Sequence, residues 1–581
     1  MNNRIKKLFI LYFISFMFLF SSNVYAWDEK DVQESLVNLK SGETITAESG
    51  KIYLFKCVQK MVNNENEEAN RAGWGASVFK GDNKGVIIES TDKSQELELP
   101  LKLNGWFKID IGYAAGTDSF IVKETEKDNS YNYVENNEAY DAHKLYGNQY
   151  IYEKRALISN FNGNSIKISP YNNYRARIAY IKLVGLTSEE IAAYNKSDEG
   201  ASGRRIIYDF DGYSDFFSGS YPTVDSLKKK TVDVLSKKNV GEINWCLGTT
   251  GMLTYNSRYA GKAFEGVDRY DNQLREGDKL AREQILNILK TGKSPLEVVA
   301  DEAEKKGVKI NASLRMDAFY NPKIYGFLNG AMYDEYKDCV QEGSFSMNYT
   351  YPKFRDYIKN ILREAASFKN VDGITLDFCR YPTVMGSQTT KIYKNFYRAI
   401  IMNKFMKEVR AEIPKNKNIT VRIPYKNPLS YGFDVETWIE KGYIDRLIIS
   451  NISKEDFFDI TPYVEMVKGT KVKLYIGIVA DVKGHDLTKA EEELMKKGLY
   501  VHEREYLKLD QYLSRAYDVY KKGADGVFLF NTSSNLLIDT SAPTQATYLG
   551  DKVLIHRWYN FQYNEGNPLR KEKVFITKFS I

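Results

Sequence analysis

The sequence predicts an α/β protein in which a (β/α)8 TIM barrel at residues 204–535 follows an all-β, sandwich-like domain at residues 27–195. From residue 204 onward, β-forming runs alternate with amphipathic helical segments, and eight such units can be counted. Before residue 186 the runs are short and are broken by Gly and Asn. A polar, small-residue stretch at 195–203 separates the two patterns and marks the domain boundary.

The first 26 residues have the pattern of a secretory signal peptide. Basic Arg4, Lys6 and Lys7 precede an apolar stretch, Leu8–Phe20, and Ala26 ends a small-residue cleavage site. The apolar stretch is shorter than the roughly 20 residues that a membrane-spanning helix needs. We expect an exported, periplasmic, cell-surface or extracellular protein without a membrane segment once the signal is removed; an uncleaved signal anchor is the alternative.

The predicted N-terminal domain consists of short strands at fairly regular spacing. The expected strands are 51–57, 85–89, 97–101, 106–111, 119–122, 165–169 and 176–183. Many short strands bounded by turn residues favour a β-sandwich, for which carbohydrate binding is one interpretation. A short helix with acidic residues in its first turn is expected at 187–194.

The barrel prediction follows from one strand for each helix. The expected strands are 205–211, 242–247, 308–317, 371–379, 419–425, 445–451, 471–481 and 526–531. The expected helices are 224–238, 277–306, 353–368, 391–413, 435–441, 460–468 and 510–522. Residues 536–581 carry more β-like than helical runs, so we expect a C-terminal β-like extension there, a strand pair packed on the barrel.

Composition argues against several function classes. The formal net charge of +6 falls to +3 when the three cations of the signal peptide are removed, and no basic stripe suits nucleic acid. None of the four His ends a barrel strand, so neither a catalytic triad nor a metal site is expected, and no cofactor is predicted. The four Cys lack metal-type spacing, and we expect no disulfide framework. The 43 Tyr suit surfaces that stack on sugar rings.

The predicted fourth barrel strand ends in a carboxylate. Side chains alternate along a strand, so Asp377 shares a face with Thr375 and Cys379, while apolar Leu376 and Phe378 share the other. The apolar face is expected to meet the helices, which directs Asp377 toward the barrel axis near the carboxyl end of the strand. TIM-barrel active sites lie at that end.

Polar residues also gather at the ends of the other predicted strands. They are Asp209, Asp211, Asn244, Cys246, Arg315, Asp317, Arg422, Asn451, Asp481 and Asn531. Because burying an unpaired ionised group is costly, this ring indicates a ligand site. We expect Asp211, Trp245, Tyr255, Arg315, Arg380, Tyr381, Arg422, Tyr425, Asn451 and Asn531 to contact substrate; packing under loops and structural ion pairs are the alternatives.

Glycoside cleavage requires two carboxyl groups with opposed duties, one ionised and one protonated. Asp377 is the first catalytic candidate, and Asp317 and Asp481 are candidate partners. Acidic residues in the following loops, Glu265, Asp268, Glu436 and Glu503, are further alternatives. A salt bridge from Asp377 to Arg315, Arg380 or Arg422 that only holds the barrel together is the structural interpretation.

Residues 371–382 resemble the "DGI-hydrophobic-LD-aromatic-x-RYP" signature of the family 10-like bacterial glycosyl hydrolases. The segments 295–307, 442–445 and 523–530 are similar to that family's context, so the resemblance covers roughly 205–535. It implies an α-amylase-like barrel with Asp377 at the position of the nucleophile. The fifth strand ends Arg422-Ile423-Pro424-Tyr425, without the Glu that amylase-type enzymes place there as general acid.

These observations favour an exported glycoside hydrolase that cleaves a polysaccharide or oligosaccharide. A non-catalytic carbohydrate-binding or surface-assembly protein on a degenerate barrel is the alternative, which the missing Glu of the fifth strand favours. Another hydrolase or lyase using the same rim is a third reading. The sugar, the linkage, the stereochemical outcome and the oligomeric state are left open.

Overall fold

The computed structural model describes residues 36–56, 73–82, 84–91, 93–125, 132–136, 138, 141, 144–171, 174–196, 203–387, 391–485, 487–532, 534–538, 542–563 and 570–578. The expected signal peptide lies outside these residues. The chain divides into two compact units, residues 1–118, 138–191 and 568–581 in the first and residues 119–137 and 192–567 in the second. No helix in the described ranges is long and apolar enough to cross a membrane.

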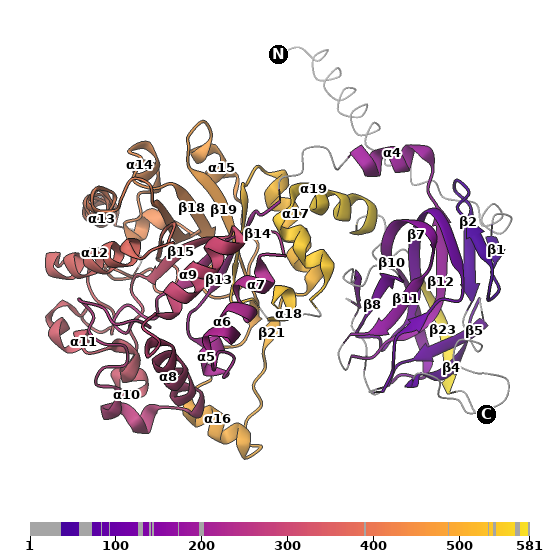
Figure 1. Ribbon diagram of the computed structural model, residues 1–581, viewed down its shortest axis with the longest axis horizontal. Helices are drawn as coiled ribbons and strands as arrows, with labels where there is room; N and C mark the ends of the chain where they lie inside the picture. The colour runs from indigo at the N-terminus through magenta and orange to yellow at the C-terminus, as the bar shows by residue number, and fades with distance from the viewer. Residues whose placement is uncertain are drawn as a thin grey trace, which may run out of the picture. The chain divides into compact units, whose positions relative to one another are not determined.

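The second unit contains a closed barrel of eight parallel strands (Figure 1). They are β13 (Ile206–Phe210), β14 (Val240–Cys246), β15 (Lys309–Arg315), β16 (Gly373–Asp377), β17 (Asn418–Pro424), β18 (Arg446–Ser450), β19 (Lys473–Val479) and β22 (Gly526–Phe530). Each strand pairs with its neighbour in this order, and β13 pairs with β22 to close the barrel. The predicted parallel eight-stranded barrel is confirmed, and each predicted strand overlaps the observed one.

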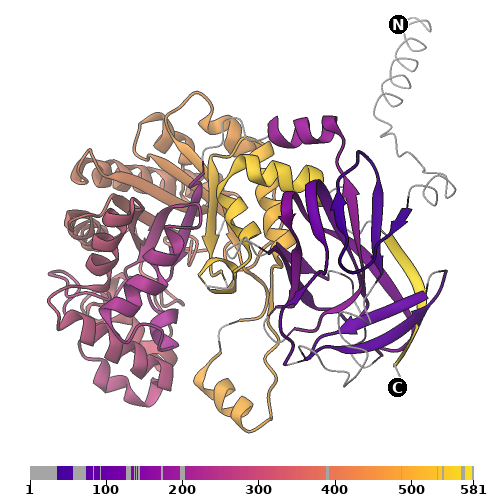
Figure 2. The same ribbon diagram turned by 45° about the vertical axis from the view of Figure 1, so that its right-hand side comes forward.

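Helices lie around the outside of the barrel (Figures 1 and 2). The main ones are α6 (Val224–Lys230), α7 (Val232–Leu235), α8 (Glu276–Leu289), α9 (Pro295–Lys306), α12 (Pro352–Ser367), α13 (Ile392–Glu412), α14 (Val435–Glu440), α15 (Thr461–Val467) and α17 (Leu509–Lys521). The single helix expected at 277–306 is two helices, because Gly292 has a φ of 85° and Ser294 caps a new helix that begins at Pro295.

The second unit also contains shorter elements. They are β8 (Ser119–Glu124), β9 (Asn132–Glu135), α5 (Ser214–Phe217), η2 (Val267–Gln273), α10 (Pro322–Tyr325), η3 (Gly326–Asn329), α11 (Met332–Glu335), η4 (Lys337–Cys339), η5 (Pro428–Tyr431), β20 (Asp481–Lys483), α16 (Lys489–Lys496) and β21 (Glu505–Tyr506). Strands β20 and β21 form an antiparallel hairpin that carries α16 in its connection.

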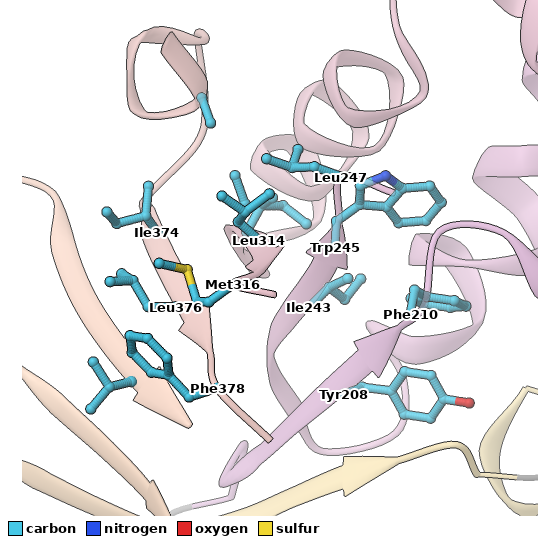
Figure 3. Packing of buried hydrophobic residues seen from close by; sticks show 14 of the residues in the cluster. Tyr208, Phe210, Ile243, Trp245, Leu247, Leu314, Met316, Ile374, Leu376 and Phe378 are labelled. Carbon is cyan, nitrogen blue, oxygen red and sulfur yellow. The ribbon is translucent and has the colours of Figure 1, made fainter. Parts of the chain in front are cut away.

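The two faces of the barrel strands have different surroundings. Leu314, Leu376 and Phe378 belong to the large apolar core that includes residues of the surrounding helices (Figure 3). A separate small cluster contains Phe528 and Phe530 of β22. These two residues alternate along the strand with Val527 and Leu529, which belong to the large core, so Phe528 and Phe530 face the barrel interior. The apolar face of β16 therefore meets the helices, as the alternation in the sequence predicts.

The first unit is built on a nine-stranded sheet in the order β1-β3-β12-β5-β4-β23-β10-β7-β2. Its strands are β1 (Leu36–Asn38), β2 (Thr44–Thr46), β3 (Ile52–Lys56), β4 (Gly75–Lys80), β5 (Lys84–Glu89), β7 (Lys102–Ala114), β10 (Gly147–Asn164), β12 (Arg177–Gly185) and β23 (Arg570–Lys578). Strands β6 (Leu97–Glu98) and β11 (Ile166–Pro170) form an antiparallel pair, and α4 (Ser188–Lys196) follows. The sandwich-like arrangement itself stays a prediction.

The longest strand, β10, was not predicted. It carries Glu153, Lys154 and Arg155, which are buried although they are charged. The Nε atom of Arg155 lies 2.8 Å from Oδ1 of Asp110 on the neighbouring strand β7. Because charged pairs occupy the buried positions, the sequence lacks the polar and apolar alternation that signals a strand.

The C-terminal residues are only partly β-like, and the expected strand pair is not formed among the described residues. In place of a strand pair, the described residues form α18 (Ser534–Leu537), η6 (Thr544–Gly550), α19 (Lys552–Arg557), the π-helix η7 (Trp558–Tyr563) and one strand, β23. Strand β23 pairs with β10 and β4 in the nine-stranded sheet. Residues of β23 alternate between exposed and buried positions. The strands that pair with it are distant in sequence, so local patterns cannot identify them.

Candidate functional site

A cavity of about 270 Å³ lies at the carboxyl ends of the barrel strands. It is lined by Tyr208, Asp209, Phe210, Asp211, Ser214, Asp215, Arg315, Arg380, Arg504, Tyr506, Asn531, Thr532 and Ile538. These residues come from β13 and α5, the ends of β15 and β22, the loop after β16, and the β21 side of the hairpin. This is the face of the barrel on which TIM-barrel sites are built.

The turn after β13 is fixed by Gly212 and Asp211. Gly212 has a φ of 69°, and a Cβ atom there would lie 2.1 Å from the carbonyl oxygen of Cys246, so only glycine fits. Oδ1 of Asp211 accepts hydrogen bonds from the backbone N–H groups of Tyr213 at 2.8 Å and Ser214 at 2.7 Å. Asp211 thus lines the cavity and also holds the start of α5.

Asp209 is the carboxyl group with the most informative surroundings. It is 8% exposed, and its Oδ1 accepts a hydrogen bond from Nδ2 of Asn244 on the neighbouring strand. Burial raises the pKa of Asp209 to about 7, with Arg422 opposing the shift and Asp377 adding to it. Near neutral pH this side chain therefore holds a proton in a substantial fraction of molecules.

Asp377 lies in the barrel interior and is 4% exposed. Its Oδ2 accepts a hydrogen bond from Nη1 of Arg422 at 3.1 Å, and its Oδ1 accepts one from the N–H of Cys379 at 2.8 Å. Arg422 is fully buried; its Nη2 donates to Oγ of Ser450 at 3.0 Å, and its guanidinium carbon lies 3.8 Å from the ring centre of Phe530. The ion pair to Arg422 that the sequence left open is present, and Asp377 is not among the residues lining the cavity.

Two further arginines line the cavity with different surroundings. Arg504 is paired: its Nε donates to Oδ1 of Asp481 at 2.9 Å, and Nδ2 of Asn531 lies 3.4 Å from Oδ2 of the same carboxylate. Arg315 ends β15 in register with Asp377 on β16. Within the described ranges, the guanidinium of Arg315 has no hydrogen bond or ion pair. Asp481 thus binds two residues that line the cavity, Arg504 and Asn531. The N–H groups of Arg315, by contrast, make no hydrogen bond in the described part of the chain.

The candidate partner Asp317 lies elsewhere. It is 1% exposed and accepts a hydrogen bond at 3.1 Å from the backbone N–H of Met347, in the long loop after β15. Burial raises its pKa well above the usual range for an aspartate. Asp317 does not line the cavity, so the structure does not bring it together with Asp209 or Arg315.

The aromatic candidates are mostly occupied by protein contacts. Trp245 is fully buried on the outward face of β14, 5.5 Å from Phe210 between ring centres (Figure 3). The Tyr255 hydroxyl donates to a carboxylate oxygen of Glu364 at 3.1 Å. The ring of Tyr425 stacks on a neighbouring phenylalanine, with 4.4 Å between ring centres. None of the three lines the cavity.

Of the other residues predicted to contact substrate, some line the cavity and some bind only protein groups elsewhere. Nδ2 of Asn451 donates to the carbonyl oxygen of Asp456 at 2.9 Å, away from the cavity. Arg380 lines the cavity, and its guanidinium carbon lies 5.6 Å from the ring centre of Tyr381. Of the predicted site residues, Asp211, Arg315, Arg380 and Asn531 line the cavity directly.

Several cavity residues were not among the predicted site residues. Asp209 could have been chosen, because strand alternation places it on the inward face two positions before Asp211. Arg504 and Tyr506 carried no local signal, since only the pairing of β20 with β21 brings them to the barrel end. Asp215 lies in α5, where its carboxylate accepts a hydrogen bond from the Tyr221 hydroxyl at 2.7 Å.

The described residues give no sign of a metal centre or a disulfide. Among them, no group of three or more His, Cys, Asp or Glu side chains could hold a metal ion. Cys246, Cys339 and Cys379 are free and buried, and Cys57 lies outside the described ranges. Burial raises the pKa of the Cys246 thiol to about 12, so this residue is an inert core thiol.

Comparisons with known proteins give only distant similarity. No family model matches the chain, and no curated protein matches it. A chitinase from Bacteroides thetaiotaomicron aligns with 63% of this chain and 99% of its own, at 12% identity and a TM-score of 0.32. A Streptomyces plicatus β-hexosaminidase aligns with 64% and 66%, at 11% identity and a TM-score of 0.33. A Clostridium thermocellum xylanase with CBM22-1 and GH10 modules aligns with 86% and 96%, at 10% identity and a TM-score of 0.31.

These three structures are glycoside hydrolases, but similarity at this level does not assign an activity. The resemblance to the family 10-like glycosyl hydrolases is likewise not established by any of them. The function has to be argued from the cavity itself.

Proposed function

We propose that the barrel hydrolyses glycosidic bonds in a polysaccharide or oligosaccharide. The observation that carries the proposal is the contrast between two carboxyl groups near the cavity. Asp209 lines the cavity and has a pKa raised to about 7, while Asp377 is ion-paired with Arg422 at 3.1 Å. Glycoside cleavage uses such a pair, with one carboxyl group protonated and the other ionised.

In this mechanism Asp209 is the general acid. Its carboxyl proton moves to the glycosidic oxygen as the bond from that oxygen to the anomeric carbon breaks. Asp377 is the second carboxylate, either as the nucleophile that attacks the anomeric carbon or as the base that takes a proton from the attacking water. The configuration of the first product, followed by NMR, distinguishes these two roles.

Binding without cleavage is the second candidate function, and two observations favour it. Asp377 is 4% exposed and both of its oxygens accept hydrogen bonds from the protein, so a substrate atom must compete with these contacts. The fifth strand also ends without the expected Glu. A carbohydrate-binding or surface-assembly protein would need the cavity to hold a sugar, but it would not need an accessible Asp377.

The deciding experiment measures the release of reducing ends from a polysaccharide panel by residues 27–581. Asp209→Asn and Asp377→Asn are expected to lower the rate by at least about 100-fold, the usual contribution of a positioned acid or base. Asp317→Asn is the matched control, because Asp317 is a buried aspartate with a raised pKa that does not line the cavity. Turnover unaffected by both test variants contradicts the mechanism; polysaccharide binding without turnover in the parent supports the binding protein.

Export is part of the proposal, supported by the charge and apolar pattern of residues 1–26. Expression of the full chain in a bacterium is expected to give a cell-envelope or secreted product that begins at Trp27. N-terminal sequencing checks this, and an intact N-terminus retained in the cytoplasm contradicts it.

A further inference from the structure

We propose that the cavity binds a sugar carrying a carboxylate, that is, a uronic acid residue, through the guanidinium group of Arg315. This inference rests on the proposed function and names the substrate class of the same site. It starts from the contrast among the arginines at the strand ends. Arg422 is paired with Asp377 at 3.1 Å, and Arg504 with Asp481 at 2.8 Å. Arg315 lines the cavity, and within the described part of the chain its guanidinium has neither a hydrogen bond nor an ion pair.

Arg315 is half-buried, and the charges of Asp209 and Asp211 act on it without a hydrogen bond to any of its N–H groups in the described residues. Unmatched donors in a partly desolvated position are costly, and a bound carboxylate would accept hydrogen bonds from them. The guanidinium is planar and presents parallel N–H donors whose spacing matches the two oxygens of a carboxylate. A neutral sugar hydroxyl supplies a single acceptor and no charge, so it compensates Arg315 less well.

The acidic residues of the cavity are already engaged with other groups. Asp211 accepts two backbone N–H groups in the turn before α5, and Asp215 accepts the hydroxyl of Tyr221. Asp209 accepts from Asn244 and is protonated in part near neutral pH. An anionic ligand therefore meets carboxyl groups that already accept hydrogen bonds from the protein, and the guanidinium of Arg315, whose donors make none in the described part of the chain.

The size of the cavity agrees with a single sugar ring at this position. Its volume of about 270 Å³ is close to the lower end of the roughly 300–1,000 Å³ range of ligand pockets. We therefore place one uronate residue against Arg315, with the rest of a chain extending from the opening. Arg315 then recognises the carboxylate of the sugar ring, and the glycosidic oxygen of the same residue stays accessible to the carboxyl proton of Asp209.

Isothermal titration calorimetry on residues 27–581 tests the inference without depending on turnover. The probes are glucuronate, galacturonate and mannuronate, each compared with its neutral sugar, and a sulfated galactose. At least one uronate is expected to bind about 10-fold or more tightly than its neutral counterpart, because a hydrogen bond between charged groups contributes more than one to a neutral hydroxyl. Arg315→Met is expected to abolish the preference, and Arg315→Lys to keep only part of it.

Arg363→Met is the control, because Arg363 is an exposed arginine of α12 paired with Glu412 at 3.5 Å. Its uronate preference should equal that of the parent. If Arg315→Met fails to fold, the loss in Arg315→Lys decides the question. Equal affinity for uronates and neutral sugars, equal affinity for the sulfated sugar, or a preference that survives both Arg315 substitutions overturns the inference.

The inference and the proposed function fail in different ways. Uronate preference in a protein that cleaves no glycan contradicts the hydrolase and leaves the role of Arg315 standing. Cleavage of neutral glycans with no uronate preference supports the hydrolase and contradicts the role of Arg315. In Asp209→Asn, uronate preference should persist while hydrolysis is lost, because the carboxylate contact belongs to Arg315.

Discussion

Replacing Asp209 by Asn should change how the stability of the barrel depends on pH. The pKa of Asp209 rises from 3.8 to about 7 because the side chain is buried. Each unit of pKa corresponds to about 1.36 kcal/mol, so the shift of roughly three units corresponds to about 4 kcal/mol. Asn has nearly the same shape as the protonated acid and cannot ionise, so it removes this contribution.

The sign follows from which state holds the proton more tightly. Below about pH 3.8 Asp209 is protonated in both the folded and the unfolded chain. Between about pH 3.8 and pH 7 the folded chain keeps the proton and the unfolded chain loses it, so stability falls as pH rises. Relative to Asp209→Asn, the parent should therefore lose as much as about 4 kcal/mol of unfolding free energy between pH 4 and pH 7.5.

Urea unfolding at a series of pH values measures this difference. Fluorescence of Trp245 and Trp438 reports on the barrel, since both side chains are fully buried in its core. Asp317→Asn cannot serve as the control here, because burial also raises the pKa of Asp317 and its replacement would change the pH dependence by itself. Val421→Ala, which removes buried volume but no titratable group, is the control, and its pH dependence should match that of the parent. A difference between parent and Asp209→Asn that stays constant from pH 4 to pH 7.5 would refute the argument that burial protonates Asp209.

Three further predictions concern the barrel interior and the turn after β13. Arg422→Met leaves the buried carboxylate of Asp377 unpaired and should cost about 3–5 kcal/mol in unfolding free energy, measured by urea unfolding, with much of it recovered in a double variant that also carries Asp377→Asn. Arg446→Met breaks the ion pair with Glu242 near the amino ends of the strands; it should destabilise the protein by a similar amount, while uronate affinity per folded molecule stays at the parent value. Gly212→Ala places a Cβ 2.1 Å from a backbone carbonyl oxygen and should lower the stability by at least about 1–3 kcal/mol, seen as a lower Tm.

The barrel could be predicted because its signals are local. Each strand is a short β-forming run beside an amphipathic helix, and the apolar face of β16 identifies the side that meets the helices. Strands β10 and β23 were missed for the opposite reason. Glu153 and Arg155 fill buried positions of β10 through partners on other strands, and β23 depends on partners about 400 or more residues away.

The site could be predicted only in part. The alternation along the strands is local information, and it sufficed to place Asp377, Arg315 and Arg422 on the interior side. It could not decide that Arg422 pairs with Asp377, because Arg315 and Arg380 were equally available in the sequence. The hairpin that carries Arg504 to the cavity forms only when β20 pairs with β21.

The class of the fold and the end of the barrel at which polar groups gather follow from local patterns, because periodicity and strand order are properties of the chain. Which of these groups are paired and which keep unused donors depends on packing. Desolvation and ion pairing depend on distances between strands, and these distances protonate Asp209, pair Asp377 and leave Arg315 without a partner in the described residues. The chemistry of this cavity is therefore a consequence of packing.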